Sequence, residues 1–187
     1  MISVRALTNN MNVIVRSLKA SQSVVVVSWL PQYHDMGLIG SVLSMLYCGG
    51  AGVYLSPLHF ISNPLLWLQL STKYKATHLQ GPNFAYALVV RRFKSSPSKP
   101  SLQLQSLQHI FNAAEPIVVD TVREFLSTFS QYGLSRSAMT GGYGLAESCV
   151  YVSDDGHRAL EVRREPLASE DRVEVVREWS VVDDSKW

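Results

Sequence analysis

Acidic residues are scarce in most of this chain. Residues 1–153 contain 11 lysines and arginines but only 5 acidic residues, whereas residues 154–187 contain 6 basic and 10 acidic residues. The two segments therefore carry net charges of +6 (11 − 5) and −4 (6 − 10), which sum to +2 for the chain. So small a positive charge argues against a nucleic-acid partner. The few carboxylates of the first segment are each functional candidates: Asp35, Glu115, Asp120, Glu124 and Glu147.

Cysteine is also rare, with Cys48 and Cys149 the two examples. Two cysteines are too few for a disulfide scaffold, and their separation does not match a metal-ligand pattern. We therefore expect a reducing compartment, the cytoplasm. Residues 1–20 alternate polar and apolar side chains and lack the continuous apolar run of a secretion signal.

Four common motifs are missing from the sequence. The absence of G-x-x-x-x-G-K-[ST] and G-x-G-x-x-G excludes a P-loop and a dinucleotide-binding fingerprint. The absence of G-x-S-x-G and H-E-x-x-H argues against a serine hydrolase and a zinc protease of the familiar kinds. A nucleotide-binding function therefore needs another way to hold phosphate.

Residues 36–72 contain no charged side chain, and residues 36–55 are about as long as a bilayer-spanning helix. Glycines interrupt this stretch, and the pair Gly49 and Gly50 breaks it. We expect a buried helix followed by a short strand and no transmembrane segment, with a membrane-associated structural protein as the alternative.

The chain of 187 residues is 47% hydrophobic and 17% charged, a composition that excludes intrinsic disorder. Apolar periodicity, β-branched runs and Gly/Pro signals predict alternating helices and strands. The expected helices are residues 4–19, 36–47, 64–70, 82–93 and 118–129. The expected strands are residues 24–27, 52–55, 76–79, 108–112 and 138–142.

This alternation, without a hairpin signal, predicts an α/β fold with a parallel sheet and helices on both faces. Ligands bind such sheets beyond the carboxyl ends of the strands. The unusual residues of the sequence follow the expected strands, at residues 28–35, 59–60, 80–84, 112–116 and 141–147. The functional site is therefore expected among them.

The glycine-rich segment 141–148 combines backbone freedom with an aromatic side chain and a carboxylate. Its glycines allow a ligand to approach the backbone, Tyr143 offers a stacking surface for a purine, and Glu147 can bind a divalent cation. The alternative is an ordinary turn followed by a surface glutamate.

Two further acidic segments leave their roles open. Glu115, in residues 113–116, can hydrogen-bond a base or ribose, or it can favour the N-terminus of the following helix through the helix dipole. His34, beside Asp35, can act as a general base, a metal ligand or a hydrogen-bonded loop residue. The other histidines lack triad partners or metal spacing and are interpreted as structural or surface residues: His59, His78, His109 and His157.

Four segments together resemble one known family. They are V-S-W-L-P-Q-Y-H-D-M-G-L-I-G at 27–40, G-P-N-F-A-Y at 81–86, F-N-A-A-E-P at 111–116 and Y-G-L-A-E at 143–147. In this order and at these separations they resemble the motifs of fatty-acyl-AMP ligases, which belong to the adenylate-forming superfamily. The resemblance covers roughly residues 7–153, and it departs from the family at Ala113, where a glycine is usual.

The resemblance implies the large N-terminal domain of an adenylate-forming enzyme, with ATP and Mg²⁺ as cofactors. A fatty acid is adenylated to acyl-AMP, and the acyl group then passes to an acyl carrier protein or to CoA. It implies catalytic roles for His34 and Glu147, with Glu147 holding the metal and His34 flanking the acyl carboxylate. Nucleotide contacts are implied for Ala114, Glu115, Pro116, Gly142, Tyr143 and Gly144, and acyl contacts for Asn83, Phe84 and Tyr86.

The Leu145-Ala146 pair resembles the acyl-AMP ligase branch, in which a carrier-protein phosphopantetheine is the usual acceptor. The resemblance places residues 1–153 in the centre of an AMP-binding domain and residues 154–187 in a charged tail that begins the next subdomain. A phosphate loop before residue 1, and a ribose-binding T-G-D motif and lysine-bearing subdomain after residue 187, are expected in the complete enzyme. The alternatives are part of an acyl-CoA synthetase and a non-catalytic acyl- or nucleotide-binding remnant.

Overall fold

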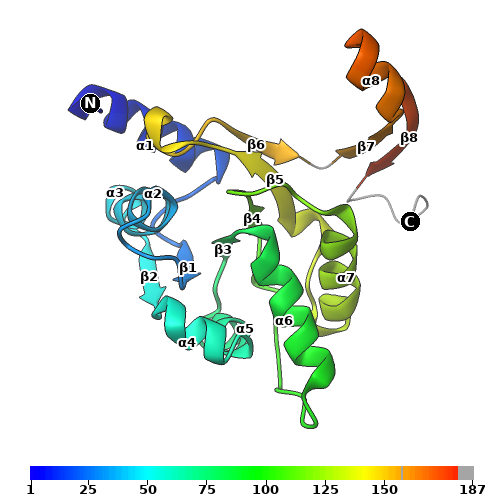
Figure 1. The fold of residues 1–187 in the computed structure, drawn as a ribbon. Coiled ribbons are helices and arrows are strands. Elements are labelled where there is room, and N and C mark those ends of the chain that lie inside the picture. The colour runs from blue at the N-terminus through cyan, green and yellow to red at the C-terminus, as the bar shows by residue number, and fades with distance from the viewer. Residues whose placement is uncertain (157, 181–187) are drawn as a thin grey trace.

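The computed structural model describes residues 1–156 and 158–180 and contains a central six-stranded sheet (Figure 1). Its strand order is β2-β1-β3-β4-β5-β6. The first five strands pair in parallel, and β6 pairs antiparallel with β5. The strands are β1 (Val25–Ser28), β2 (Ala51–Tyr54), β3 (His78–Gly81), β4 (His109–Asn112), β5 (Met139–Tyr143) and β6 (Ser153–Gly156).

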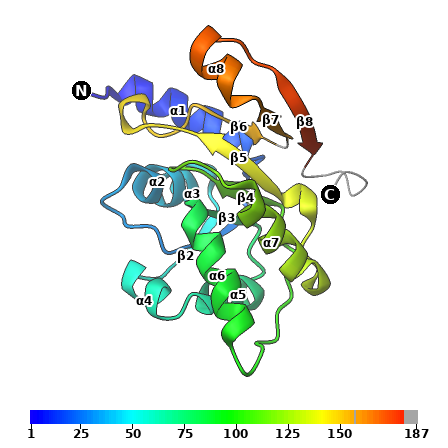
Figure 2. The ribbon, with the colours of Figure 1, turned by 45° about the vertical axis from the view of Figure 1, so that its right-hand side comes forward.

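Helices pack on both faces of this sheet, which confirms the predicted α/β fold class (Figures 1 and 2). One face carries α1 (Val4–Ser17), α2 (Asp35–Gly37), the π-helical segment η1 (Leu38–Leu43) and α3 (Ser44–Cys48). The other face carries α5 (Leu65–Tyr74), α6 (Asn83–Ser95) and α7 (Val119–Phe129), preceded by the short α4 (Pro57–Ser62).

The main core lies between the sheet and the helices α5 to α7. Trp67, Tyr86 and Phe125 are completely buried there, and they pack on strand residues such as Val27 and Ile110. Side chains that alternate along a strand point to opposite faces, so Val26, next to Val27, contributes to a smaller cluster on the α1–α3 side. Burial on both faces explains the run of valines in β1.

The strand order places a topological switch point between β1 and β3. The chain passes from β1 outward to the edge strand β2 and then returns across β1 to β3. β1 and β3 share a single register pair, Val26 with His78, so the two strands diverge towards their carboxyl ends. A crevice at such a point is the usual ligand site of an open α/β sheet.

Several details of the fold differ from the expectation. The helix predicted over 36–47 contains the π-helical turn η1, and α4 lies in a stretch for which no helix was expected. The predicted parallel sheet gains the antiparallel strand β6, which spans residue 153, the predicted domain boundary. Beyond it, β7 (Arg158–Val162), α8 (Arg164–Glu170) and β8 (Val175–Ser180) form a two-stranded arm.

No helix within the described residues is long and apolar enough to cross a membrane. The uncharged stretch instead forms η1, α3, the mostly exposed edge strand β2, α4 and most of α5. His157, one of the histidines interpreted as structural or surface residues, lies outside the described residues, as do residues 181–187.

His78, at the start of β3, confirms the structural interpretation for one histidine. Its side chain is buried, its Nε2 lies 2.8 Å from the Leu18 carbonyl oxygen, and its Nδ1 lies 2.8 Å from Thr77 Oγ1. Burial lowers the pKa of His78 to about 4; the Leu18 hydrogen bond opposes this shift, and the stacked His109 ring adds to it. The neutral ring therefore connects the sheet to the end of α1.

We expect the chain to lose stability as the pH falls from about 6.5 to about 4. The unfolded chain takes up a proton at His78 near its ordinary pKa, whereas the folded chain does so only near pH 4. The contribution of neutral His78 to the free energy of unfolding is complete above pH 6.5 and amounts to about 3 kcal/mol. Urea unfolding at a series of pH values measures it.

A His78→Asn variant should show a shallower loss of stability between pH 6.5 and 4.5 than the unaltered chain. His59, which is exposed on α4, provides the control, and His59→Asn should leave the slope unchanged. An identical slope for His78→Asn would contradict the prediction.

Candidate functional site

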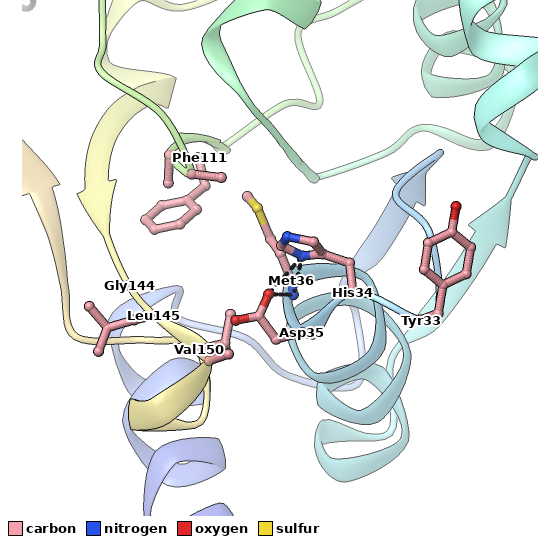
Figure 3. Close-up of a pocket in the computed structure, with 11 residues that line it drawn as sticks. Tyr33, His34, Asp35, Met36, Phe111, Gly144, Leu145 and Val150 are labelled. Atoms are coloured by element: carbon pink, nitrogen blue, oxygen red, sulfur yellow. Dashed lines mark hydrogen bonds and ion pairs between the residues drawn. The ribbon is translucent and has the colours of Figure 1, made fainter.

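A pocket of about 370 Å³ lies beyond the carboxyl ends of β1, β4 and β5 (Figure 3). Three segments form its walls, each following or ending one of these strands. The lining residues are Tyr33, His34, Asp35, Met36, Phe111, Ala113, Ala114, Gly144, Leu145, Ala146 and Val150. The pocket therefore joins three of the four motifs recognised in the sequence.

His34 and Asp35 form the polar part of the β1 wall. His34 Nδ1 lies 2.7 Å from Asp35 Oδ1. The Met36 amide donates to Asp35 Oδ1 over 2.7 Å and to His34 Nδ1 over 3.3 Å. Both contacts hold the ring through Nδ1, which leaves Nε2 as the ring nitrogen available to a ligand. The His34 side chain is 55% exposed, so it is accessible to a ligand.

The turn that presents this pair depends on a glycine. A β-carbon at Gly37 would overlap the carbonyl oxygen of Pro31, so the start of α2 can pack against the preceding loop only with glycine there. The π-helical turn η1 follows directly. Such turns are frequent at functional sites, and this one begins four residues after His34.

The β4 wall contains Phe111, Ala113 and Ala114. Ala114 has a φ of 73°, in the left-handed region that favours glycine. Ala113, the residue that departs from the family pattern, is 3% exposed and does not carry this conformation. The positive φ turns the chain from the end of β4 towards Glu115 and Pro116, which are both exposed.

The Glu115 carboxylate bonds to the N-terminus of a helix, though not to the one that follows it in the chain. Glu115 Oε1 accepts a hydrogen bond of 2.5 Å from the Phe84 amide, in the first turn of α6. This contact combines a capping bond with a favourable interaction with the helix dipole. The helix-terminus role is therefore present, on α6 and not on α7.

We expect Glu115→Ala to destabilise the chain by about 1 kcal/mol, the usual cost of removing a capping acceptor. Urea denaturation measures this loss. Glu115→Gln retains an acceptor oxygen and should recover most of the stability. If Glu115→Ala lowered nucleotide affinity without lowering stability, the carboxylate would act on the ligand and not on the helix.

The third wall is the glycine-rich segment after β5. Tyr143 is 58% exposed, which suits a stacking surface, and Gly142 and Gly144 flank it. Gly144 lines the pocket, and a β-carbon there would overlap the carbonyl of Val150. Tyr143 and Gly142 line a neighbouring pocket of about 510 Å³ on the α7 side of β5.

Glu147 lies in the short 3₁₀ helix η4 (Ala146–Ser148), and it is exposed. The described residues contain no group of three or more His, Cys, Asp or Glu side chains that could bind a metal by themselves. Mg²⁺ is usually held by one or two carboxylates together with waters and phosphate oxygens of a substrate. An accessible single carboxylate beside a pocket therefore fits Mg²⁺ bound together with ATP.

The residues expected to bind the acyl chain lie at and behind the N-terminus of α6. Asn83 Oδ1 accepts hydrogen bonds from Asn112 Nδ2 and from the Val118 amide, which ties α6 to the ends of two neighbouring elements. Tyr86 is completely buried and donates to the Phe111 carbonyl oxygen over 2.9 Å. Phe84 is 43% exposed and packs edge-on against Trp29.

The structure thus brings together only part of the predicted site. His34, Ala114 and Gly144 line one pocket, and Glu147 lies next to its wall. The other predicted residues do not line it: Asn83, Phe84, Tyr86, Glu115, Pro116, Gly142 and Tyr143. Sequence reasoning missed Met36, Phe111 and Val150, although the first two belong to the recognised motifs.

The comparisons with known proteins agree with this architecture. Residues 1–185 match the family model described as AMP-binding enzyme. A medium-chain-fatty-acid–[acyl-carrier-protein] ligase, TtuA of Teredinibacter turnerae, is 41% identical over 79% of this chain and 23% of its own length. The corresponding ligase JamA of Moorena producens is 37% identical over 81% of this chain and 26% of its own. The chain spans about a quarter of the length of these relatives.

Solved structures show the same similarity in three dimensions. A fatty acyl-adenylate ligase from L. pneumophila, determined with acyl adenylate and pyrophosphate, superimposes with a TM-score of 0.84 at 36% identity. The match covers 95% of this chain and 32% of that structure. The family model that spans nearly the whole chain and the pocket built from the family's own motifs lead to one conclusion: the chain belongs to the AMP-binding enzyme family.

Proposed function

We propose that this chain is part of an ATP-dependent enzyme that converts a fatty acid to acyl-AMP and pyrophosphate. The observation that supports this most directly is the pocket in which His34, Ala114 and Gly144 meet. These residues belong to three separate motifs, and the first and last of them are more than 100 residues apart in the sequence. Folding brings the three together at one edge of the sheet. The names of the relatives support fatty acids as the substrate class.

The proposed reaction needs no nucleophile from the protein. The carboxylate oxygen of the fatty acid attacks the α-phosphorus of ATP, the bond to the β-phosphate oxygen breaks, and pyrophosphate leaves. The protein contributes positioning and charge stabilisation. His34, oriented by Asp35 through its Nδ1, is suited to face the acyl carboxylate or the phosphate through Nε2.

The nucleotide would lie along the glycine-rich wall. Tyr143, being exposed, is proposed to stack on adenine, with Ala114, Glu115 and Pro116 beside the base and Gly142 and Gly144 allowing close approach of the backbone. Glu147 is proposed to hold the Mg²⁺ that accompanies ATP, and the metal would neutralise phosphate charge. Of the acyl contacts, Phe84 has the exposed ring area that such a role requires.

The acyl acceptor is proposed to be the phosphopantetheine thiol of an acyl carrier protein. The Leu145-Ala146 pair and the carrier-protein specificity named for two relatives support this choice. CoA, which presents the same thiol on a nucleotide, is the alternative acceptor. Transfer breaks the acyl–phosphate bond of acyl-AMP, forms a thioester and releases AMP.

Fatty-acid-dependent exchange of pyrophosphate into ATP tests the first step in the enzyme that contains this chain. We expect exchange that requires both a fatty acid and Mg²⁺, followed by acyl transfer to holo carrier protein in preference to CoA. Exchange followed by acyl transfer to CoA in preference to holo carrier protein would support an acyl-CoA synthetase. Saturable binding of an acyl-AMP analogue without any exchange would support a non-catalytic binding protein. The absence of both binding and exchange would refute the proposal.

A further inference from the structure

The segment that follows Glu147 has an unusual backbone. Cys149 has a φ of 68° and Val150 a φ of 125°, and neither is a glycine. Positive φ is unfavourable for residues with a side chain, above all for a β-branched one. Such conformations persist only when surrounding contacts enforce them. Something outside this dipeptide must therefore hold it.

The contacts come from Asn10 in α1, 138 to 141 residues away in the sequence. Asn10 Nδ2 donates to the Ser148 carbonyl oxygen at 3.2 Å and to the Tyr151 carbonyl oxygen at 2.7 Å. Its Oδ1 accepts from the Tyr151 amide at 3.3 Å. One carboxamide thus bonds to the backbone on both sides of the strained pair.

The anchored segment borders the pocket at several points. Val150 lines the pocket (Figure 3). Its carbonyl lies so close to Gly144 that a β-carbon there would overlap it. The Tyr151 ring stacks at 6.2 Å on Phe111, which lines the opposite wall. On the other side, Ser148 closes the short helix that carries Glu147. Displacement of the segment would move both a pocket wall and the carboxylate.

We propose that Asn10 is a positioning residue that fixes the 148–151 segment and, through it, the place of Glu147 and Val150. The part of this proposal that concerns Mg²⁺ and nucleotide rests on the proposed function. The part that concerns the 148–151 segment does not. Asn10 itself does not line the pocket. It acts from α1, an element that carries none of the four motifs.

The test compares three variants of the enzyme that contains this chain. Asn10→Ala removes all three hydrogen bonds, and Asn10→Asp retains size and an acceptor but has no N–H to donate to the two carbonyls. Asn9→Ala is the matched control, because Asn9 is the preceding residue of α1 and is exposed. Both alanine variants gain similar helix propensity, so the propensity effect cancels.

Amide hydrogen exchange gives the first measurement. We expect Asn10→Ala and Asn10→Asp to speed exchange at residues 148–152 about tenfold, as expected when hydrogen bonds that oppose local opening are lost. Exchange in α6 and all exchange in Asn9→Ala should stay unchanged. Unchanged exchange at 148–152 in Asn10→Ala would overturn the proposal whatever the chain's function.

The second measurement is binding of a non-hydrolysable ATP analogue at a series of Mg²⁺ concentrations. We expect the apparent Mg²⁺ affinity to fall about 10- to 100-fold in Asn10→Ala, the range seen when residues that orient metal ligands are removed. If Asn10→Ala speeds amide hydrogen exchange at residues 148–152 but leaves the Mg²⁺ dependence of analogue binding normal, Asn10 has only a structural role and the proposal is overturned. If the unaltered enzyme that contains this chain binds no analogue, the proposed function fails, while amide hydrogen exchange still decides whether Asn10 holds the segment.

Discussion

Replacing Glu147 with glutamine should lower Mg²⁺-dependent adenylation about 100-fold in the enzyme that contains this chain. The change removes one negative charge and one metal-binding group while it keeps the size of the side chain. Loss of a single group that stabilises charge in the transition state has an effect of this order. Glu147 is exposed and lies next to the pocket wall, which supports its proposed role as a metal ligand.

The measurement is pyrophosphate exchange as a function of Mg²⁺ concentration, and excess Mg²⁺ should restore part of the activity of Glu147→Gln. Glu124→Gln is the matched control. Glu124 is also a surface glutamate, but it lies on α7, outside the pocket, and its Oε1 is 2.6 Å from Lys94 Nζ of α6. Near-normal exchange in Glu147→Gln would remove this residue from the site.

Replacing Trp67 with alanine should destabilise the chain by about 3 to 5 kcal/mol, the usual cost of truncating a large buried aromatic residue. Trp67 is completely buried among Trp29, Phe60 and Tyr86. Its Nε1 also donates to the Val27 carbonyl oxygen over 2.8 Å, which ties α5 to β1. The variant therefore loses both packing and a buried hydrogen bond.

Urea and thermal unfolding measure this effect, and the midpoint of thermal unfolding should fall by roughly 10 °C. Trp67→Phe retains most of the volume and should cost less than Trp67→Ala. Leu46→Ala is the surface control, since Leu46 is 75% exposed and should change stability by no more than about 0.5 kcal/mol. A similar loss in Leu46→Ala and Trp67→Ala would mean that the main core does not carry the stability.

The sequence predicted the parallel sheet well because burial on both faces leaves a clear signal. The run of valines in β1 and the helical periods of α1, α6 and α7 agree with the expected elements to within a few residues. β6, β7 and β8 were missed. They are short antiparallel strands in a charged segment, and such a segment lacks the apolar pattern used to recognise a strand.

The sequence predicted those site residues whose position follows from the strand that precedes them. His34 and Gly144 come together because both follow strands of one parallel sheet. Glu115 illustrates the limit, since its partner is the Phe84 amide of another helix, 31 residues away. Tyr86 was expected to contact the acyl chain, but it lies on the face of α6 that packs into the core. Those contact roles stay predictions.

The exposed edge strand β2 has a consequence for any work with residues 1–187 alone. β2 pairs with β1 on one side, and Ala51, Gly52 and Tyr54 are exposed. Leu58 and Ile61 of α4 add exposed apolar surface nearby. A strand edge that no other described strand pairs with, beside apolar side chains, is a template for strand addition between molecules. Self-association will therefore rise with protein concentration, and lysine substitutions along β2 are the direct means to suppress it.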